Sequence, residues 1–372
     1  MVQQRAINVF GCSPRRSSRL RLATLACFLI VAHPALASVT TTPVTAPSAG
    51  LSVTARAEIL NRLATAMDGY VDPLVARKVK AMLAAQRPAY EAIEDRELLA
   101  RTLSTDLMAS SNDLHLKVAV VTTGGATELS PEEQARLEGR LAHGLMSIRR
   151  LPANIGYLKL RYFAPGRDGE ALVDAAMLML KDSDALIIDL RENTGGGGAS
   201  DERLLGHLSR APIPMAMIRW RQPDGTWKVE QRRASASPGG PLFADKPVFV
   251  LTARRTFSAA EGFALDLKAS GRAVLVGETT RGGANPGHAR SLGHGLDAFV
   301  PSGIVTHPLT KGNWNGKGVE PDVAVPAGDA LTEAYRRALA VAKPTVMTPK
   351  SIDERKKAIA DPRAVLVADQ PL

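Results

Sequence analysis

The chain of 372 residues is long enough to bury one large core or two smaller ones, and its 45% hydrophobic but only 4% aromatic content suits a soluble α/β protein. The formal charge of +10 does not indicate nucleic-acid binding, because five arginines within residues 1–37 carry half of it and the rest is scattered. The two cysteines, Cys12 and Cys27, also lie in this segment. Disulfides, thiolate catalysis and cysteine metal sites are therefore excluded from the remainder of the chain.

Residues 1–37 have the three parts of a secretory signal peptide. A basic stretch extends to Arg21, an apolar stretch covers residues 22–31, and Ala35-Leu36-Ala37 supplies a small-x-small cleavage site. The apolar stretch is short for a membrane span, and no other stretch is long enough for one. We therefore predict cleavage near Ala37 and export to the periplasm or the medium, without a stable membrane span afterwards. The long basic stretch also allows a start downstream of Met1.

The segment after the signal predicts a linker and then a small helical domain. Residues 38–54 are rich in Ser, Thr, Pro, Ala and Gly, which favours a flexible linker. Residues 55–112 show the periodicity of three helices, the first with its apolar face at Ile59, Leu60, Leu63 and Met67. The second helix is expected at about residues 73–87 and the third at about 95–108.

From residue 155 onward strands and helices alternate, which predicts an α/β domain with a mostly buried sheet. Strands are expected at residues 155–160, 185–190, 247–251 and 273–277, helices at 169–181, 204–208 and 260–267, and a hairpin at 215–230. We expect residues 278–325 to be rich in loops. Residues 327–372 predict one helix, at 329–342, followed by a disordered polar end.

Ser258 lies where a buried strand passes into a helix. The apolar run of residues 247–251 ends just before it, and an amphipathic pattern begins at Ala260, so its hydroxyl is expected beside the free N–H groups of a helix start. A serine beside backbone donors suits acyl transfer. Ser258 and Glu261 also fit the capping box S-x-x-E, in which the serine only caps a helix, and both interpretations stay open on this pattern.

A candidate base lies far upstream, at His115. Asp113, His115 and Lys117 alternate with Leu114, Leu116 and Val118, which predicts the start of a strand with His115 on its polar side. A neutral imidazole accepts a proton near neutral pH, although a single histidine in a strand is commonly just an exposed polar residue.

Residues 195–198 are four glycines that directly follow the strand at 185–190. Glycines in such a loop let backbone N–H groups approach an anion or a carbonyl oxygen closely. The dinucleotide pattern G-x-G-x-x-G fails, because its last position is Ser200 or Asp201, and no Gly-Lys-Ser/Thr follows. A peptide or oxyanion cradle fits better than a phosphate cradle, and a merely flexible turn is the alternative.

Six stretches, taken in this order, resemble the C-terminal processing (tail-specific) serine peptidase family, most closely the branch of the tricorn protease core and the interphotoreceptor retinoid-binding protein repeats. They are Asp113-Leu114-His115-Leu116 and residues 154–158, 189–198, 257–261, 277–280 and 318–322. The resemblance covers about residues 55–325. It implies a crotonase-like β/α spiral core at residues 113–326, behind the helical domain. It also implies hydrolysis of peptide bonds in peptides or unfolded proteins, often near a C-terminus, without a metal or other cofactor.

By this resemblance Ser258 matches the nucleophile, and the N–H groups of Ala259 and of Gly196 or Gly197 match the oxyanion hole. Many members use a lysine from the loop that aligns with Gly282 and Gly283, but this chain has no lysine between Lys268 and Lys311. The tricorn-like branch uses an upstream histidine instead, and His115 matches it. An imidazole can take the serine proton and return it to the leaving amine.

The resemblance also suggests supporting residues. Asn315 stands where the branch often has a glutamate, so we expect its side chain to orient the imidazole. Leu114 replaces the serine that tricorn carries next to its histidine. Asp113 and Glu261 are expected to support the catalytic pair, and Gly282, Gly283 and Asn285 to contact the substrate. No PDZ stretch is recognisable.

One alternative of a different class stays open: a catalytically weak or inactive relative that binds a retinoid-like or lipid-like ligand, or a peptide. Other catalytic interpretations are weaker, because His288, His294 and His307 lack metal-ligand spacing and no pair of carboxylates suggests a glycosidase. A working histidine base predicts that acylation of Ser258 rises with pH through about 6.5, the ordinary imidazole pKa.

Overall fold

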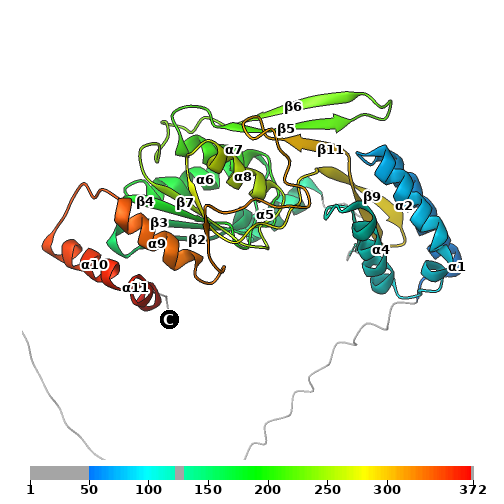
Figure 1. Ribbon diagram of the computed structural model, residues 1–372, viewed down its shortest axis with the longest axis horizontal. Coiled ribbons are helices and arrows are strands. Elements are labelled where there is room, and N and C mark those ends of the chain that lie inside the picture. Colours follow the sequence, from blue (N-terminus) through cyan, green and yellow to red (C-terminus); the bar gives the residue numbers. More distant parts are fainter. Residues whose placement is uncertain (1–49, 122–129, 370–372) are drawn as a thin grey trace, which may run out of the picture. The chain divides into compact units, whose positions relative to one another are not determined.

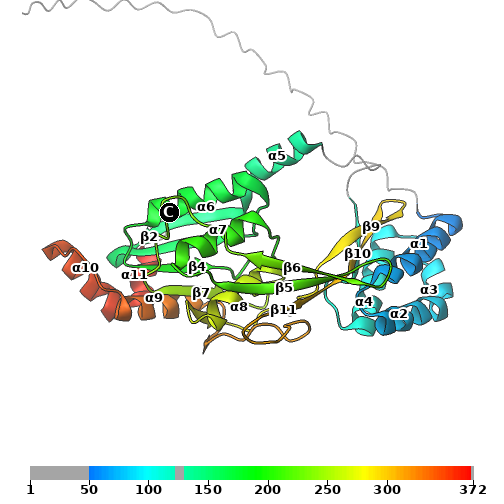
Figure 2. The same ribbon diagram turned by 90° about the horizontal axis from the view of Figure 1, so that it is seen from above.

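The structure is a computed structural model that describes residues 50–121 and 130–369 (Figures 1 and 2). The predicted signal peptide, its cleavage site and most of the predicted linker lie outside these residues. No helix within the described ranges combines the length and the apolar character that crossing a membrane requires.

A six-stranded sheet forms the centre of the fold, in the order β12-β8-β7-β4-β3-β2. All neighbours in it run parallel except β2 and β3, which are antiparallel. Its strands are β2 (Leu145–Leu151), β3 (Ile155–Leu160), β4 (Ala185–Asp189), β7 (Val248–Thr252), β8 (Val274–Gly277) and β12 (Val323–Ala324). The four strands predicted from the apolar runs are confirmed. Strand β2 was not among the predicted strands.

Helices cover both faces of this sheet (Figure 1). Alternate residues of β4 enter different cores: Leu186 and Ile188 pack with the helices of one face, and Ile187 packs with those of the other. The first face is covered by α6 (Gly166–Leu180), α7 (Ala199–Leu208) and α8 (Ala259–Ala269), and the second by α9 (Ala330–Val341), α10 (Pro349–Ala360) and α11 (Pro362–Ala368). The expectation of a disordered C-terminal end was wrong for α10 and α11, because Ala358 and Leu366 are buried against α9 and the sheet.

The helical segment after residue 50 has a core of its own. It contains α1 (Val53–Ala66), α2 (Pro73–Ala85), the short α3 (Arg87–Glu91) and α4 (Arg96–Ser111), which confirms the three predicted helices. These helices pack on an antiparallel sheet of β1 (Lys117–Val120), β10 (Leu296–Pro301) and β9 (Gly287–Gly293) (Figure 2). Ile59, Leu63 and Leu103 meet Leu296 and Val300 there. Strands β9 and β10 lie in the stretch expected to be loop.

A third sheet, in the order β11-β5-β6, contains the predicted hairpin as β5 (Pro214–Arg221) and β6 (Trp227–Arg233), with β11 (Gly303–Thr306) added to it. Helix α5 (Pro131–Arg140) begins after Ser130, whose hydroxyl accepts from the N–H of Glu133. The central sheet, the helical segment and this third sheet all contribute residues to the site described next.

Candidate active site

Ser258 occupies the turn between β7 and α8 in a strained backbone conformation, with a φ of 58° and a ψ of −123°. A positive φ is uncommon for a residue with a side chain, so the surrounding hydrogen bonds have to hold it. Phe257 donates its N–H to the carbonyl oxygen of Asn193 at 3.0 Å. The Thr256 hydroxyl donates to the carbonyl of Leu190 at 2.8 Å and accepts from the N–H of Ala253 at 3.0 Å. The turn is thereby fixed to the end of β4.

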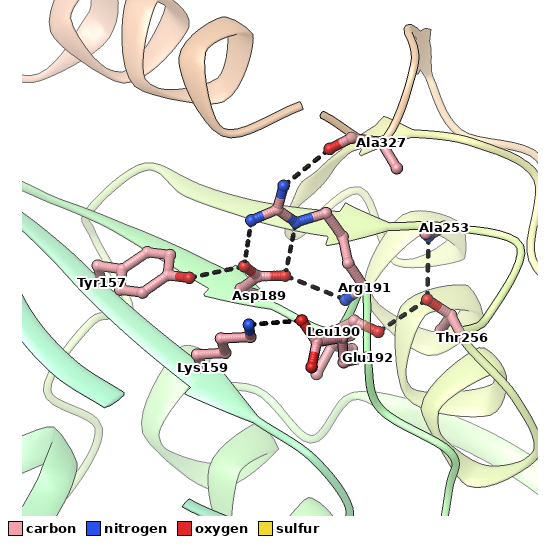
Figure 3. Close-up of polar contacts among 9 residues, drawn as sticks. All are labelled: Tyr157, Lys159, Asp189, Leu190, Arg191, Glu192, Ala253, Thr256 and Ala327. Carbon is pink, nitrogen blue, oxygen red and sulfur yellow. Dashed lines mark hydrogen bonds and ion pairs between the residues drawn. The ribbon is translucent and has the colours of Figure 1, made fainter. Parts of the chain in front are cut away.

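The end of β4 is itself held by a buried ion pair (Figure 3). The Asp189 carboxylate accepts two hydrogen bonds from the Arg191 guanidinium, at 2.6 and 2.9 Å, and one from the Tyr157 hydroxyl at 2.6 Å. Arg191 also donates to the carbonyl of Ala327 at 2.7 Å. Burial alone would raise the pKa of Asp189, but Arg191 and Tyr157 hold it below its ordinary value. These bonds anchor the strand from which the glycine loop begins.

His115 lies beside Ser258, 143 positions away in the chain, with 3.1 Å between its Nε2 and the Ser258 Oγ. The expectation that it lies on the polar side of a strand was wrong. Residues 114 and 115 form a turn before β1, and the His115 side chain is only 7% exposed. The chain turns there because Asn112, at the end of α4, adopts a left-handed conformation with a φ of 53°. The imidazole packs on the Phe257 ring, with 4.4 Å between centroids.

The electrostatic surroundings keep this imidazole neutral. Burial, together with the positive charges of Lys117 and Arg281, lowers the pKa of His115 to about 4. A neutral ring can accept the serine proton through Nε2 when its own proton is on Nδ1. Acylation is therefore not expected to follow a titration at pH 6.5, as the unperturbed imidazole suggested. This buried histidine is already in its base form well below neutral pH.

No group within the described residues hydrogen-bonds the Nδ1 of His115. The amide of Asn315, which we expected to orient the ring, lies against main chain instead: its Oδ1 accepts from the N–H of Ala284 at 3.2 Å, and its Nδ2 donates to the carbonyl of Asn112 at 3.5 Å. These contacts contradict an orienting bond from Asn315 to the imidazole. The asparagine instead joins the loop after β8 to the end of α4.

The Asp113 carboxylate is fully buried and contacts the main chain of His115 rather than its ring. It accepts from the His115 N–H at 3.0 Å through Oδ1, and from the Tyr70 hydroxyl at 3.2 Å and the Asn285 amide at 3.0 Å through Oδ2. Burial raises the pKa of Asp113, although these donors favour its charged form. The three donors come from three separate segments of the chain.

Glu261 takes the second half of the predicted capping box. Its fully buried carboxylate accepts from the N–H groups of Ser258, Gly282 and Gly283 at 2.8, 2.6 and 2.8 Å, and from the Thr280 hydroxyl at 2.5 Å. Burial raises the pKa of Glu261 against the effect of these donors. Its own N–H donates to the Ser258 carbonyl at 2.9 Å, while the Ser258 hydroxyl faces His115. The serine side chain is thus not consumed as a helix cap.

Two backbone N–H groups near Ser258 have no acceptor among the described residues, those of Ala259 and Gly196. The N–H of Gly197 is occupied, since it donates to the Phe163 carbonyl at 3.0 Å, so Gly197 drops out of the predicted oxyanion hole. Gly195 allows this close approach: a Cβ there would lie 2.7 Å from the Cβ of Ser258. Gly196 and Ala259 line the same pocket as Ser258, so their N–H groups are candidates to bind a carbonyl oxygen there.

A pocket of about 110 Å³ opens beside Ser258, Ala259 and Gly196. Its lining combines apolar side chains, among them Ile218 and Trp314, with the charged side chains of Asp266 and Arg232. Nowhere in residues 50–121 and 130–369 do three or more His, Asp or Glu side chains gather as they would around a metal ion. The chemistry that this site can supply is that of a hydroxyl, an imidazole and backbone donors.

The three residues expected to contact substrate have structural partners. Gly282 and Gly283 donate to Glu261, and Gly283 has no room for a side chain, because a Cβ there would lie 2.0 Å from the Phe257 ring and 2.9 Å from His115. The Asn285 amide is engaged with Asp113 and Asn313. Sequence reasoning missed Tyr70 and Thr280. Tyr70 gave no signal beyond an apolar helix pattern, whereas Thr280 lay within a recognised stretch.

Comparison with known proteins gives the class that the central part of the chain resembles, that of the peptidases. Residues 154–325 match the model of peptidase family S41. The carboxyl-terminal-processing protease of Picosynechococcus sp. is 30% identical over 175 residues, which are 46% of this chain and 39% of that protein. The carboxy-terminal processing protease CtpB of Bacillus subtilis is 28% identical over 177 residues, 47% of this chain and 35% of that protein.

The resemblance to the C-terminal processing peptidases is therefore confirmed. The chain spans less than half the length of these curated relatives. A crystal structure from Parabacteroides merdae, described as a possible peptidase, matches 79% of this chain and 99% of that chain with a TM-score of 0.53 and 19% identity. This likeness concerns the fold, a central mixed sheet with helices on both faces and further helices on the N-terminal side.

Proposed function

We propose that this chain is an exported serine peptidase that hydrolyses peptide bonds of peptides or unfolded proteins, near their C-termini. Ser258 is the nucleophile, His115 the general base, and the N–H groups of Ala259 and Gly196 form the oxyanion hole. The observation that carries the proposal is the 3.1 Å between His115 Nε2 and Ser258 Oγ. Cleavage near C-termini is supported by the names of the relatives, and export by the signal pattern in residues 1–37.

In this mechanism the Ser258 Oγ attacks the carbonyl carbon of the scissile bond while its proton passes to His115 Nε2. The oxygen of the tetrahedral intermediate accepts from the N–H groups of Ala259 and Gly196. The imidazolium returns the proton to the leaving amine, and the C–N bond breaks to give an acyl-enzyme. A water then attacks the ester while His115 takes its proton, and the C–O bond to Ser258 breaks as the imidazolium returns that proton to the Ser258 Oγ, which releases the second product.

The low pKa of His115 is expected to slow these reaction steps. A pKa of about 4 makes the ring a weak proton acceptor, and the imidazolium that forms has no partner for its Nδ1–H among the described residues. We therefore expect turnover to be slow compared with enzymes whose base is supported by a carboxylate.

The binding-module alternative has less support at the Ser258 site. The pocket beside Ser258 has about 110 Å³, whereas pockets for drug-sized ligands usually have about 300–1,000 Å³. A retinoid-like ligand would not fit there without rearrangement. The pocket is better matched to a single amino-acid side chain of a bound peptide.

The proposal is tested by labelling the secreted mature protein with a fluorophosphonate probe. The expected result is one covalent adduct on Ser258, lost in Ser258→Ala and retained in Ser270→Ala. Ser270 is a matched control because it lies at the other end of α8, with its hydroxyl bonded to main-chain carbonyls. Equal labelling of the wild type and Ser258→Ala would refute the proposed nucleophile.

A further inference from the structure

The main chain of His115 is held by a buried polar cluster whose members come from separate parts of the fold. At its centre, the Asp113 carboxylate has no exposed surface. One oxygen accepts from the His115 N–H at 3.0 Å, and the other accepts from Tyr70 at 3.2 Å and from Asn285 at 3.0 Å. A buried carboxylate whose hydrogen-bond donors are all in place is held rigidly. Removing one donor destabilises its charged form, because a buried oxygen then loses a hydrogen bond that water does not replace.

Tyr70 brings the helical segment into this cluster. It follows the short 3₁₀ turn Met67–Gly69, directly before α2, and its side chain is only 3% exposed. Its neighbour Val71 donates to the Pro301 carbonyl at 2.8 Å, and Arg221 of β5 donates to the Tyr70 carbonyl at 3.4 Å. Burial and the Asp113 charge raise the pKa of Tyr70, so its hydroxyl stays a proton donor.

Asn285 brings the loop after β8 into the same cluster. Its Nδ2 donates to Asp113, and its Oδ1 accepts from the Asn313 amide at 3.3 Å. Asn313 also donates to the Val305 carbonyl of β11 at 2.9 Å. The Asp113 carboxylate is therefore held between the helical segment on one side and a loop of the peptidase domain on the other.

The position of the His115 imidazole depends on this buried cluster, because the ring makes few polar contacts of its own. Its Nδ1 has no partner among the described residues, so no hydrogen bond at that nitrogen fixes the ring. What fixes it is packing on Phe257 and the position of its main chain. The main-chain N–H is the atom that Asp113 holds.

Resting on the proposed function, we infer that Tyr70 and Asn285 are positioning residues that hold the Asp113 carboxylate and so keep the His115 Nε2 facing Ser258. The helical segment then contributes to the catalytic apparatus through the Tyr70 hydroxyl, in addition to α4, which leads directly into Asp113 and His115. This role is distinct from substrate contact, which the sequence suggested for Asn285.

The test compares Tyr70→Phe with Tyr90→Phe in the mature protein. Tyr90 is a matched control: it is buried in the same helical segment and donates to the Asp106 carboxylate at 2.7 Å, but it does not contact Asp113. Fluorophosphonate labelling rates are measured from pH 4 to pH 8, with folding checked by circular dichroism. Tyr70→Phe is expected to lower the labelling rate at pH 7 about tenfold, while Tyr90→Phe leaves it unchanged.

The pH dependence separates positioning from general destabilisation. Removing a donor raises the pKa of Asp113 further, so its carboxylate is protonated at higher pH and the acid limb of the labelling rate moves upward. Asn285→Asp places a second carboxylate beside Asp113 and should move that limb further. The charged groups that act on His115 beside this cluster are Lys117 of β1 and Arg281 of the loop after β8. Tyr90→Phe is expected to leave the limb in place.

The outcomes are decisive in both directions. Equal rates and equal acid limbs for Tyr70→Phe and Tyr90→Phe, with Ser258→Ala unlabelled, would overturn the positioning role and leave the peptidase proposal intact. Labelling that persists in Ser258→Ala would instead refute the proposed function itself. If Tyr70→Phe does not fold, Asn285→Asp carries the same test from the opposite side of Asp113.

Discussion

Ser258 and His115 meet at 3.1 Å but are held by two differently built regions. The Ser258 region is made of neighbouring pieces of one parallel sheet: the end of β4, the turn after β7 and the start of α8, joined mainly by main-chain hydrogen bonds. The His115 region is made of side chains from distant segments, with Tyr70, Asp113 and Asn285 meeting in one buried cluster. The nucleophile is thus set by local chain geometry, whereas the base is set by tertiary packing.

The largest effect that would sharpen this comparison is expected from His115→Ala. Loss of the base should reduce peptide hydrolysis by up to about 10⁶, the loss seen when a serine or histidine of such a unit is removed. The measurement is turnover of a quenched fluorescent peptide by the purified mature chain. His207→Ala serves as the control, since His207 is also a buried histidine, but its ring bonds Asp174 of α6 and not Ser258. Similar losses in both variants would point to a folding defect.

A smaller effect concerns the protonation of the base. With a pKa of about 4, the His115 ring is mostly neutral at pH 5, whereas an ordinary pKa of 6.5 would leave only about one ring in thirty neutral. Because the neutral form is the base, activity limited by this group rises with pH through about 4. The titration is measured directly from the imidazole resonances by NMR, assigned with His115→Gln. A midpoint near 6.5 would contradict the burial that the structure gives this ring.

The smallest effect is expected for Asn315→Ala. Its amide bonds main-chain groups of Ala284 and Asn112, both at the long end of the hydrogen-bond range, and none of its bonds reaches the imidazole. Hydrolysis should therefore fall by no more than about threefold, as for one weak hydrogen bond. A loss of a hundredfold or more would restore the orienting role that the resemblance implied.

The sequence predicted the Ser258 region well because its signals are local. An apolar run, a turn and an amphipathic helix follow one another within about twenty residues, and the free N–H groups at the start of a helix follow from its geometry. The role of the Ser258 hydroxyl was harder to predict, because the pattern S-x-x-E fits both a helix cap and a nucleophile. In the structure Glu261 accepts from the Ser258 main chain, and the hydroxyl is left for His115.

The His115 region could be predicted only in part. The resemblance suggested the histidine, but alternation placed it on an exposed strand face, because no local pattern announces a left-handed Asn112 that turns the chain inward. Tyr70 and Asn285 reach Asp113 across 43 and 172 positions. Strand β9, which completes the sheet under the helices, is rich in glycine and polar residues and carries little strand signal of its own. Its pairing with β10, which in turn pairs with β1, decides its structure.

The bare backbone at Gly283 has a consequence for how such sites can diverge. A side chain there would collide with the Phe257 ring and with His115 itself. The resemblance implies a lysine from this loop in many members of the family, whereas here the Phe257 ring and the imidazole occupy that space. A single exchange of Gly283 for lysine would meet an occupied space, because both the Phe257 ring and the His115 ring would have to move to admit it. The histidine layout of this site therefore excludes a lysine from position 283 as long as both rings stay in place.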